Sequence, residues 1–386
     1  MIQLTTIVGT RPQVIKASAL HRQIKEKYSN TIHENIVHTG QHYDDRMSDI
    51  FFRELEFPVM DINLNTGSDT HPRQISFMME GVERVLNSLM PDMVLVYGDT
   101  NSTFAAAVAA NKMNFPVMHV EAGVRSSNKT TPEEINRILT DHVSSVLAAP
   151  TVNGFNNLVK EGFNAYAEPP FSINNPILAN TGDVMLDNLN YYFELAMEKS
   201  AEMGRYNVSP DNYAFMTLHR DFNTDSAERL NSIIGSMVAL SASFAMPVIF
   251  SVHPRTAKAM REKLDKKLQD ILKSGDHIIT IPPATYLEAI MFMNHASVIC
   301  TDSGGIQKEA FFLKKPVVLF REKTEWDELV RAGNTILAGA GEETLLEAAE
   351  VFLHKKPKIV YPALFGQGNA AELICQEILR FFEKQA

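Results

Sequence analysis

Acidic side chains follow the ends of two neighbouring apolar runs in the first half of the chain. In MVLVYGDTNST the apolar run stops at Gly98 and Asp99 follows it, and PVMHVEAGVRS ends its run at Glu121. Glu133 lies further on, directly after Pro132 in TPEEINRILTDH. Because the carboxyl ends of parallel strands open onto one crevice, these carboxylates are expected to converge there. Carboxylates gathered at a crevice suit acid–base chemistry on a bound ligand.

Each of these acids also has a structural explanation when it is taken singly. Asp99 and Glu121 could cap helices or lie solvated in loops. Glu133 lies where a helix is expected to begin, and the helix dipole favours a carboxylate there whatever its function. Only the convergence of all three favours a catalytic site.

Basic and imidazole side chains lie at the ends of other apolar runs. In LTTIVGTRPQVIK, Gly9 and Arg11 occupy the expected passage from strand to helix, where helix N–H groups and a guanidinium favour a phosphate. The runs YAFMTL and VIFSV end in His219 and His253. Imidazoles suit acid–base work near neutral pH, although a single histidine at such a place is more often a structural donor.

The segment SVICTDSGGIQKEAFFLKKPVVLF gives the strongest nucleotide signal in the second half. Ser303, Gly304 and Gly305 form the expected turn from strand to helix, where backbone N–H groups can approach a diphosphate. Glu309 follows on that helix and could accept hydrogen bonds from a ribose diol. Arg321, after VVLF, is a candidate second phosphate partner, and an exposed arginine at a strand end explains it equally well.

Apolar runs alternate with stretches of helical spacing along the whole chain. They are LTTIV, ENIVHT, MVLVYG, PVMHVE and VLAAP, then YAFMTLH, MPVIFSVH, HIITI, SVICTD and PVVLF. This pattern predicts an α/β protein of two Rossmann-like domains, with parallel sheets facing across a cleft. We place the domains at residues 1–182 and 183–369, with AEPPFSINNPILANTG as a crossover. The amphipathic segment 370–386 could complete the first domain by packing back onto it.

Composition limits the classes of binding partner and the cellular compartment that are expected for this chain. The chain of 386 residues carries a net charge of −10, so no global basic field favours nucleic acid or an anionic membrane surface. Cys300 and Cys375 are the only cysteines and cannot form a disulfide framework, which fits a reducing cytoplasm. The sequence shows no cationic leader and no apolar run of about 18 residues, so a soluble, unexported protein is expected.

The motifs together resemble one enzyme family. GTRPQVIK, HTGQHYDD, YGDTNST, HVEAGVRS, PEEINRILTDH, LHR, SVHPR, TDSGGIQKEA and FREKTEWDEL occur in order over nearly the whole chain. They resemble the non-hydrolysing UDP-N-acetylglucosamine 2-epimerases. The resemblance implies a fold like that of GT-B glycosyltransferases, with UDP held mainly by the C-terminal domain. It also implies a homodimer in surface-polysaccharide synthesis that needs no metal or NAD.

The family's reaction assigns roles to the candidate residues. Loss of UDP from C1 makes the C2 proton removable and gives 2-acetamidoglucal, after which the proton returns to the opposite face and UDP re-adds. The resemblance implicates Asp99, Glu121, Glu133 and His219 in catalysis, without settling which acts on which face. It assigns binding of the phosphates, sugar and UDP to Arg11, Lys16, Arg137, His253, Ser303, Gly304, Gly305, Glu309 and Arg321.

Departures from the family pattern bear on substrate and regulation. Hydrolysing relatives carry Ala-Asp where this chain has Pro12 and Gln13, which favours retention of UDP. The segment Gln41–Asp45 differs from the corresponding segment of allosteric members, so substrate activation is not expected. Thr131 replaces a bulky apolar residue, which predicts altered sugar contacts.

Other motifs are closer to the branch that includes UDP-2,3-diacetamido-2,3-dideoxy-glucuronate 2-epimerases. They are HTGQHYDDRMSDIFF, GDVMLD, GGIQKEA and TEWDEL. That sugar carries an extra carboxylate and needs another cation, for which Lys308 is a candidate, although a lysine on a helix surface is usually only solvated.

Two alternatives come from other functional classes. A GT-B glycosyltransferase would share the nucleotide seat, but it needs at most one base and an open acceptor groove. A non-catalytic UDP-sugar-binding protein would not require Asp99, Glu121 and His219 together. Binding without turnover would favour this second alternative.

Overall fold

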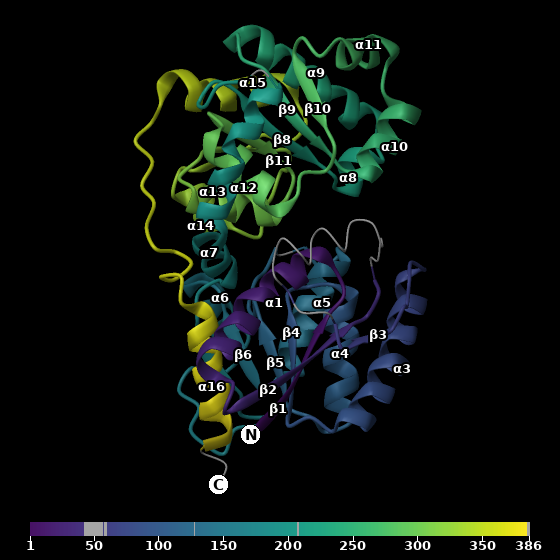
Figure 1. Cartoon of the computed structure of the whole chain (residues 1–386), viewed down its shortest axis with the longest axis vertical. Helices are drawn as coiled ribbons and strands as arrows, with labels where there is room; N and C mark the ends of the chain where they lie inside the picture. Colours follow the sequence, from purple (N-terminus) through teal and green to yellow (C-terminus); the bar gives the residue numbers. More distant parts are fainter. Residues whose placement is uncertain (42–56, 58–59, 127, 207, 384–386) are drawn as a thin grey trace. The chain divides into compact units, whose positions relative to one another are not determined.

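The computed structural model describes residues 1–41, 57, 60–126, 128–206 and 208–383 (Figure 1). The chain divides into two compact units, Met1–Asn190 with Ala363–Ala386 and Tyr191–Pro362. The sequence places the boundary near Gly182, whereas this division falls inside a continuous helix, Val184–Glu198.

Parallel strands form the centre of each unit. In the part of the chain that the structure describes, the first unit holds a seven-stranded sheet and the second a six-stranded one. The first sheet has the order β3-β2-β1-β4-β5-β6-β7 and the second the order β10-β9-β8-β11-β12-β13. The strands are β1 Ile2–Val8, β2 Ile32–His38, β3 Ile62–Asn63, β4 Met93–Tyr97, β5 Val117–Val120, β6 Val146–Ala149, β7 Ile177–Asn180, β8 Ala214–Leu218, β9 Val248–Val252, β10 Ile278–Ile281, β11 Val298–Thr301, β12 Val317–Leu319 and β13 Thr335–Leu337.

Helices connect successive strands. They are α1 Arg11–Gln23, α3 His71–Leu89, α4 Asn101–Lys112, α5 Pro132–His142, α6 Val152–Lys160, α7 Val184–Glu198, α8 Asp221–Thr224, α9 Ala227–Phe244, α10 Pro254–Lys263, α11 Lys266–Ser274, α12 Tyr286–His295, α13 Gly304–Phe312, α14 Asp327–Arg331, α15 Glu342–Glu350 and α16 Ala370–Glu383. Helical segments of other pitch are η1 Ile24–Tyr28, η2 Lys199–Tyr206 and η3 Val351–Lys355.

The two sheets share one topology, and it confirms the predicted pair of Rossmann-like units. In each sheet, the direction in which successive strands are added reverses next to the first strand. This switch point lies between β1 and β4 in the first sheet and between β8 and β11 in the second. Ligands of open α/β sheets bind outside the strand carboxyl ends at such a switch point. Gly98 and Asp99 follow β4, and Asp302 and Ser303 follow β11, so the predicted chemistry lies at both switch points.

Sequence pattern explains the central strands well and the edge strands poorly. Every residue of β4 is buried, as expected for a continuous apolar run covered on both faces. Strand β7 lies inside the Pro- and Asn-rich stretch that the sequence indicates as a crossover, and β13 has only three residues. Both are edge strands, whose short apolar stretches give little periodic signal.

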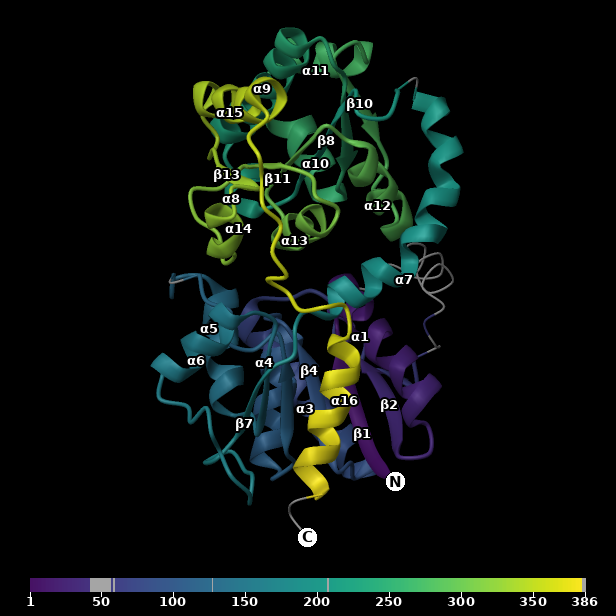
Figure 2. The ribbon, with the colours of Figure 1, turned by 90° about the vertical axis from the view of Figure 1, so that its left-hand side faces the viewer.

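Helix α16 packs in the first unit, against α1, β6 and β7 (Figure 2). Its buried face includes Ile374, Cys375, Ile378 and Phe381. Asp187 accepts hydrogen bonds from the N–H groups of Ala370 (3.1 Å) and Ala371 (2.9 Å). These bonds satisfy two amides at the start of the helix.

Neither cysteine is placed to react. Cys300 and Cys375 are free and buried, and burial raises the pKa of each thiol to about 12. No helix in the described ranges is long and apolar enough to cross a membrane.

His38, at the end of β2, predicts a pH-dependent loss of stability. Burial lowers its pKa from 6.5 to about 4, and its Nδ1 accepts a hydrogen bond from Gly40 N–H at 2.9 Å. As pH falls, the unfolded chain therefore binds a proton at His38 before the folded chain does. The contribution of neutral His38 to the free energy of unfolding is complete above pH 6.5 and disappears between about pH 6.5 and 4. Between pH 7.5 and 4.5 we expect wild type to lose about 2 kcal/mol more unfolding free energy than His38→Asn, which keeps an acceptor without titrating. Urea denaturation at both pH values measures this difference, and equal losses would contradict it.

Candidate active site

The turn after β4 presents Asp99 toward a buried arginine. Thr100 caps α4, since its hydroxyl accepts from Thr103 N–H, so the Asp99 carboxylate is not used as the helix cap. It is hydrogen-bonded to Arg137 Nη2 of α5, a side chain only 7% exposed. Asn136 of the same helix donates to the Asp99 carbonyl at 3.0 Å. Helix α5 therefore fixes both the side-chain carboxylate and the backbone carbonyl of Asp99.

Glu121 occupies an uncommon backbone conformation beside the same turn. Its φ of +80° lies in the left-handed region, which costs a non-glycine residue about 1–2 kcal/mol. Its carboxylate lies 2.7 Å from Lys16 Nζ. A Cβ on Gly98 would lie 3.2 Å from that Nζ and 3.6 Å from Glu121 Oε1. The Lys16–Glu121 pair thus lies directly over the residue that precedes Asp99.

Helix α5 carries a second acid that the sequence did not single out. Glu133 is half-buried in the first turn, whereas Glu134 is buried and accepts from Ser126 N–H (2.8 Å) and Oγ (2.9 Å). Arg137 Nη1 also lies 3.0 Å from Glu134. Glu134 therefore orients the arginine that holds Asp99. Its carboxylate is already shared between these donors.

Gln13, one of the departures from hydrolysing relatives, joins two turns of the site. Its Oε1 accepts from Gly9 N–H at 2.9 Å, and its Nε2 donates to Tyr97 O and Thr103 Oγ1, both at 2.8 Å. The turns after β1 and β4 are therefore fixed to each other. Arg11 begins α1 beside this network and is partly exposed.

In the second unit, Asp302 organises the turn that contains His219. Asp302 is fully buried and follows β11, and its carboxylate accepts from the N–H groups of His219 (3.1 Å) and Arg220 (2.9 Å). Asn223 Nδ2 donates to it at 3.1 Å, and His219 Nδ1 lies 3.3 Å away. Asp302 is not among the residues predicted from the sequence, although its place between a strand and Ser-Gly-Gly is a visible signal.

Positive charge surrounds His219. Burial lowers its pKa, Asp302 opposes this shift, and Arg220, Arg255 and Arg321 reinforce it. The ring of His253 lies 5.8 Å from the ring of His219, measured between centroids. His253 also accepts from Arg255 N–H at 3.2 Å, as the cap of α10. A neutral imidazole among guanidinium groups fits a bound diphosphate.

The start of α13 packs closely against the side chain of Glu325. Ser303 caps the helix by accepting from Ile306 N–H at 3.4 Å. A Cβ on Gly304 would lie 2.2 Å from Glu325 Oε1, so a larger residue there would require the Glu325 carboxylate to move. Glu325 is in turn 2.7 Å from Arg321 Nη2.

Two further predicted residues of α13 differ in their access to solvent. Gly305 is exposed at the helix start, and Glu309 is buried in the helix body. Glu309 therefore reaches solvent less readily than a free acceptor for a ribose diol would.

Lys308 is not a solvated helix lysine. Its side chain is buried, and its Nζ lies 4.5 Å from the centroid of the Trp326 ring. A cation over an indole face is stabilised by the ring quadrupole, so Lys308 is held by packing within the second unit.

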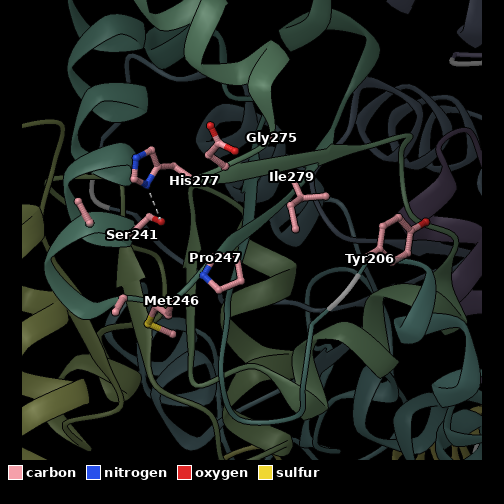
Figure 3. A pocket seen from close by; sticks show the side chains of 10 residues that line it. Tyr206, Ser241, Met246, Pro247, Gly275, His277 and Ile279 are labelled. Carbon is pink, nitrogen blue, oxygen red and sulfur yellow. Dashed lines mark hydrogen bonds between the residues drawn. The ribbon is translucent and has the colours of Figure 1, made fainter.

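A pocket of about 570 Å³ lies away from these residues (Figure 3). Pro247 and His277, which line it, precede β9 and β10, so it opens at the amino ends of these strands. The one hydrogen bond drawn there joins Ser241 Oγ and His277 Nδ1 at 3.1 Å. Because the predicted residues lie at strand carboxyl ends, this pocket is not the candidate site.

The described residues therefore bring together two chemically distinct sets. Asp99, Glu121, Lys16 and Arg137 gather in the first unit, and His219, His253 and Arg321 with Asp302 in the second. Within the described ranges, no group of three or more His, Cys, Asp or Glu could hold a metal ion. The predicted segment His42–Asp45 lies outside the described residues.

Comparison with known proteins identifies the family. The model of the UDP-N-acetylglucosamine 2-epimerase family matches residues 24–379. A UDP-N-acetylglucosamine 2-epimerase homologue from Methanococcus maripaludis is 42% identical over 98% of this chain and 99% of its own length. The UDP-2,3-diacetamido-2,3-dideoxy-D-glucuronate 2-epimerase of Pseudomonas aeruginosa is 40% identical over 98% of this chain and all of its own.

A solved structure agrees with these sequence relatives. The Methanocaldococcus jannaschii UDP-GlcNAc 2-epimerase, in complex with UDP-GlcNAc and UDP, is 39% identical and has a TM-score of 0.87. The match covers 98% of this chain and all of that one. The GT-B-like fold inferred from the motifs is thus the fold of its structural relatives. The chain belongs to the UDP-N-acetylglucosamine 2-epimerase family.

Proposed function

We propose that this protein is a non-hydrolysing 2-epimerase that interconverts UDP-GlcNAc and UDP-ManNAc. The observation that supports it most directly is the pairing of two carboxylates with two cations, Asp99 with Arg137 and Glu121 with Lys16, around one turn. An epimerase must remove a proton from one face of C2 and deliver one to the other, and it therefore needs groups that exchange protons.

The reaction proceeds by elimination and re-addition. A base of the first unit takes the C2 proton while the C1–O bond to UDP breaks, which leaves 2-acetamidoglucal and UDP. A second group then donates a proton to the opposite face of C2, and the same UDP oxygen re-forms the bond to C1. Asp99, Glu121, Glu133 and His219 carry these proton transfers.

Cationic and backbone groups retain the leaving UDP between the two steps. The phosphates are bound by His253, Arg321 and the α13 turn of Ser303, Gly304 and Gly305. Glu309 is the ribose partner that the family resemblance implies, and its burial makes it the weakest of these assignments. The phosphate and the sugar are also bound and oriented by three side chains of the first unit, Arg11, Lys16 and Arg137. Fixed positive charge at the departing diphosphate stabilises the transition state more than the ground state.

A second candidate substrate is UDP-2,3-diacetamido-2,3-dideoxy-D-glucuronate. The relative that acts on it is as similar in sequence as the UDP-GlcNAc enzymes are, at 40% identity. Its uronate carboxylate needs a cation. Lys308, buried against Trp326, does not stand as a free partner for it.

Turnover of the two nucleotide sugars decides between these substrates. Purified protein would be incubated with each one alone, and products separated by anion-exchange chromatography. We expect UDP-ManNAc from UDP-GlcNAc, with kcat/KM at least tenfold above that for the diacetamido-glucuronate nucleotide. The reverse ratio would assign the second substrate, and no turnover of either would reject the epimerase function.

We infer from the family resemblance that the protein works as a cytoplasmic homodimer in surface-polysaccharide synthesis. Its two buried, free cysteines fit a reducing compartment. Analytical ultracentrifugation should give twice the monomer mass. A monomer at micromolar concentration would contradict the homodimer.

A further inference from the structure

A buried histidine–carboxylate pair contacts the turns that carry the candidate acid–base residues. His119 of β5 and Asp141 of α5 are both fully buried, with Nδ1 2.6 Å from Oδ1. His119 Nε2 lies 2.8 Å from the carbonyl oxygen of Gly98. The two ring nitrogens therefore lie within hydrogen-bond distance of a carboxylate on one side and a backbone carbonyl on the other.

The Asp141 carboxylate is shared among three donors. Besides His119, it accepts from Gly123 N–H at 3.0 Å and lies 2.7 Å from Arg125 Nη2. Burial by itself would raise the Asp141 pKa, but His119 and Arg125 outweigh it and the pKa is lowered. The carboxylate is therefore ionised at neutral pH.

These contacts join the parts of the site that carry the acids. Gly98 directly precedes Asp99, and Gly123 ends the turn that contains Glu121. Asp141 lies on α5, the helix whose Arg137 holds the Asp99 carboxylate. One pair thus ties the β4 turn, the β5 turn and α5 to one another.

The conformation of Glu121 explains why such a tie is needed. A positive φ at a non-glycine residue persists only where its surroundings fix it. Glu121 N–H and Ala122 N–H both donate to Ala148 O at 3.0 Å, and Gly123 N–H donates to Asp141. Loss of the Asp141 bond would release one side of this strained turn.

On the basis of the proposed function, we propose that the His119–Asp141 pair is a positioning element that sets the spacing of the Asp99 and Glu121 carboxylates, and thereby kcat, without contacting the nucleotide sugar. Displacing a reacting group by about 1 Å can cost on the order of 100-fold in rate. UDP is held mainly by residues of the second unit in this proposal, so its affinity should change little when the pair is altered.

Asp141→Asn keeps the shape of the side chain and removes its charge. We expect kcat for UDP-GlcNAc to fall roughly 10- to 100-fold, while Kd for UDP, measured by calorimetry, stays within threefold. His119→Gln can still donate to the Gly98 carbonyl, so it should retain more kcat than His119→Ala and serves if Asp141→Asn fails to fold.

The His21–Glu34 pair provides a matched control. It is another histidine–carboxylate pair of the first unit, 2.9 Å apart, and joins α1 to β2. Glu34→Gln should lower the unfolding temperature and leave kcat within twofold. If Glu34→Gln lowered kcat as much as Asp141→Asn does, general destabilisation would explain both, and the positioning proposal would be wrong.

Ring NMR separates failure of this proposal from failure of the proposed function. Nitrogen-15 spectra of the histidines at pH 7.5 should show both ring nitrogens of His119 hydrogen-bonded in wild type, and this signal should vanish in His119→Gln. A His119 ring without these hydrogen bonds, or wild-type kcat in a folded Asp141→Asn, would overturn the positioning element. Absence of turnover in wild type alone would reject the epimerase function and leave the NMR result as the test of the pair.

Discussion

Replacing Asp99 by asparagine should nearly abolish epimerisation while leaving UDP binding almost intact. The variant keeps the side-chain shape and an oxygen that can accept from Arg137, but it cannot exchange a proton. General acid–base groups contribute about 10²- to 10⁴-fold in rate, so we expect kcat to fall by that factor. UDP affinity should stay within a few fold, because most of the predicted UDP residues lie in the second unit.

Kinetics and calorimetry on the same preparations check this expectation. Asp270→Asn is the matched control, since that aspartate pairs with Lys273 on exposed α11. The control should match wild type in both measurements. A loss of UDP affinity in Asp99→Asn as large as its loss of kcat would move Asp99 from catalysis to ligand binding.

Replacing Gly123 by alanine should strongly destabilise the first unit. Gly123 has a φ of +75°, and an added Cβ would lie 2.2 Å from the Gly154 carbonyl oxygen and 2.7 Å from its carbon. Those atoms belong to the backbone at the start of α6 and cannot rotate away. Left-handed strain of about 1–2 kcal/mol and overpacking of about 1–3 kcal/mol predict a total loss of about 2–5 kcal/mol.

Gly67→Ala separates these two contributions. Gly67 has a φ of +73°, and nothing lies within 4 Å of the Cβ position. This variant should therefore lose only the conformational part, about 1–2 kcal/mol. Urea denaturation followed by circular dichroism gives both values. Equal losses in the two variants would show that the contact with Gly154 carries no cost.

The sequence predicted the residues at strand ends because their signal is local. An apolar run that stops at Gly98, Glu121 or His219 identifies both the strand and the end that opens onto a ligand. The order of such runs along the chain, with helices between them, was enough to predict two Rossmann-like units, and the topology confirms them.

The residues that contact these side chains could not be predicted from the sequence pattern. Asp302 reaches the His219 backbone across 83 positions, and Asp141 reaches His119 across 22. No periodicity relates such residues. Parallel pairing of β8 with β11 brings Asp302 to His219, and the packing of helix α5 brings Asp141 to His119 on β5. Lys308 shows the same limit, because a buried lysine over Trp326 cannot be told from a solvated one by its position on a helix.

Deuterium incorporation during turnover tests the central claim most directly. Protein would be incubated with UDP-GlcNAc in D2O without added metal or NAD, and the products followed by proton NMR. Elimination and re-addition predict UDP-ManNAc with deuterium at C2, because the returning proton comes from groups that exchange with solvent. Release of free ManNAc and UDP would instead identify a hydrolysing enzyme, and UDP-ManNAc that kept its C2 hydrogen would contradict proton exchange at Asp99 and Glu121.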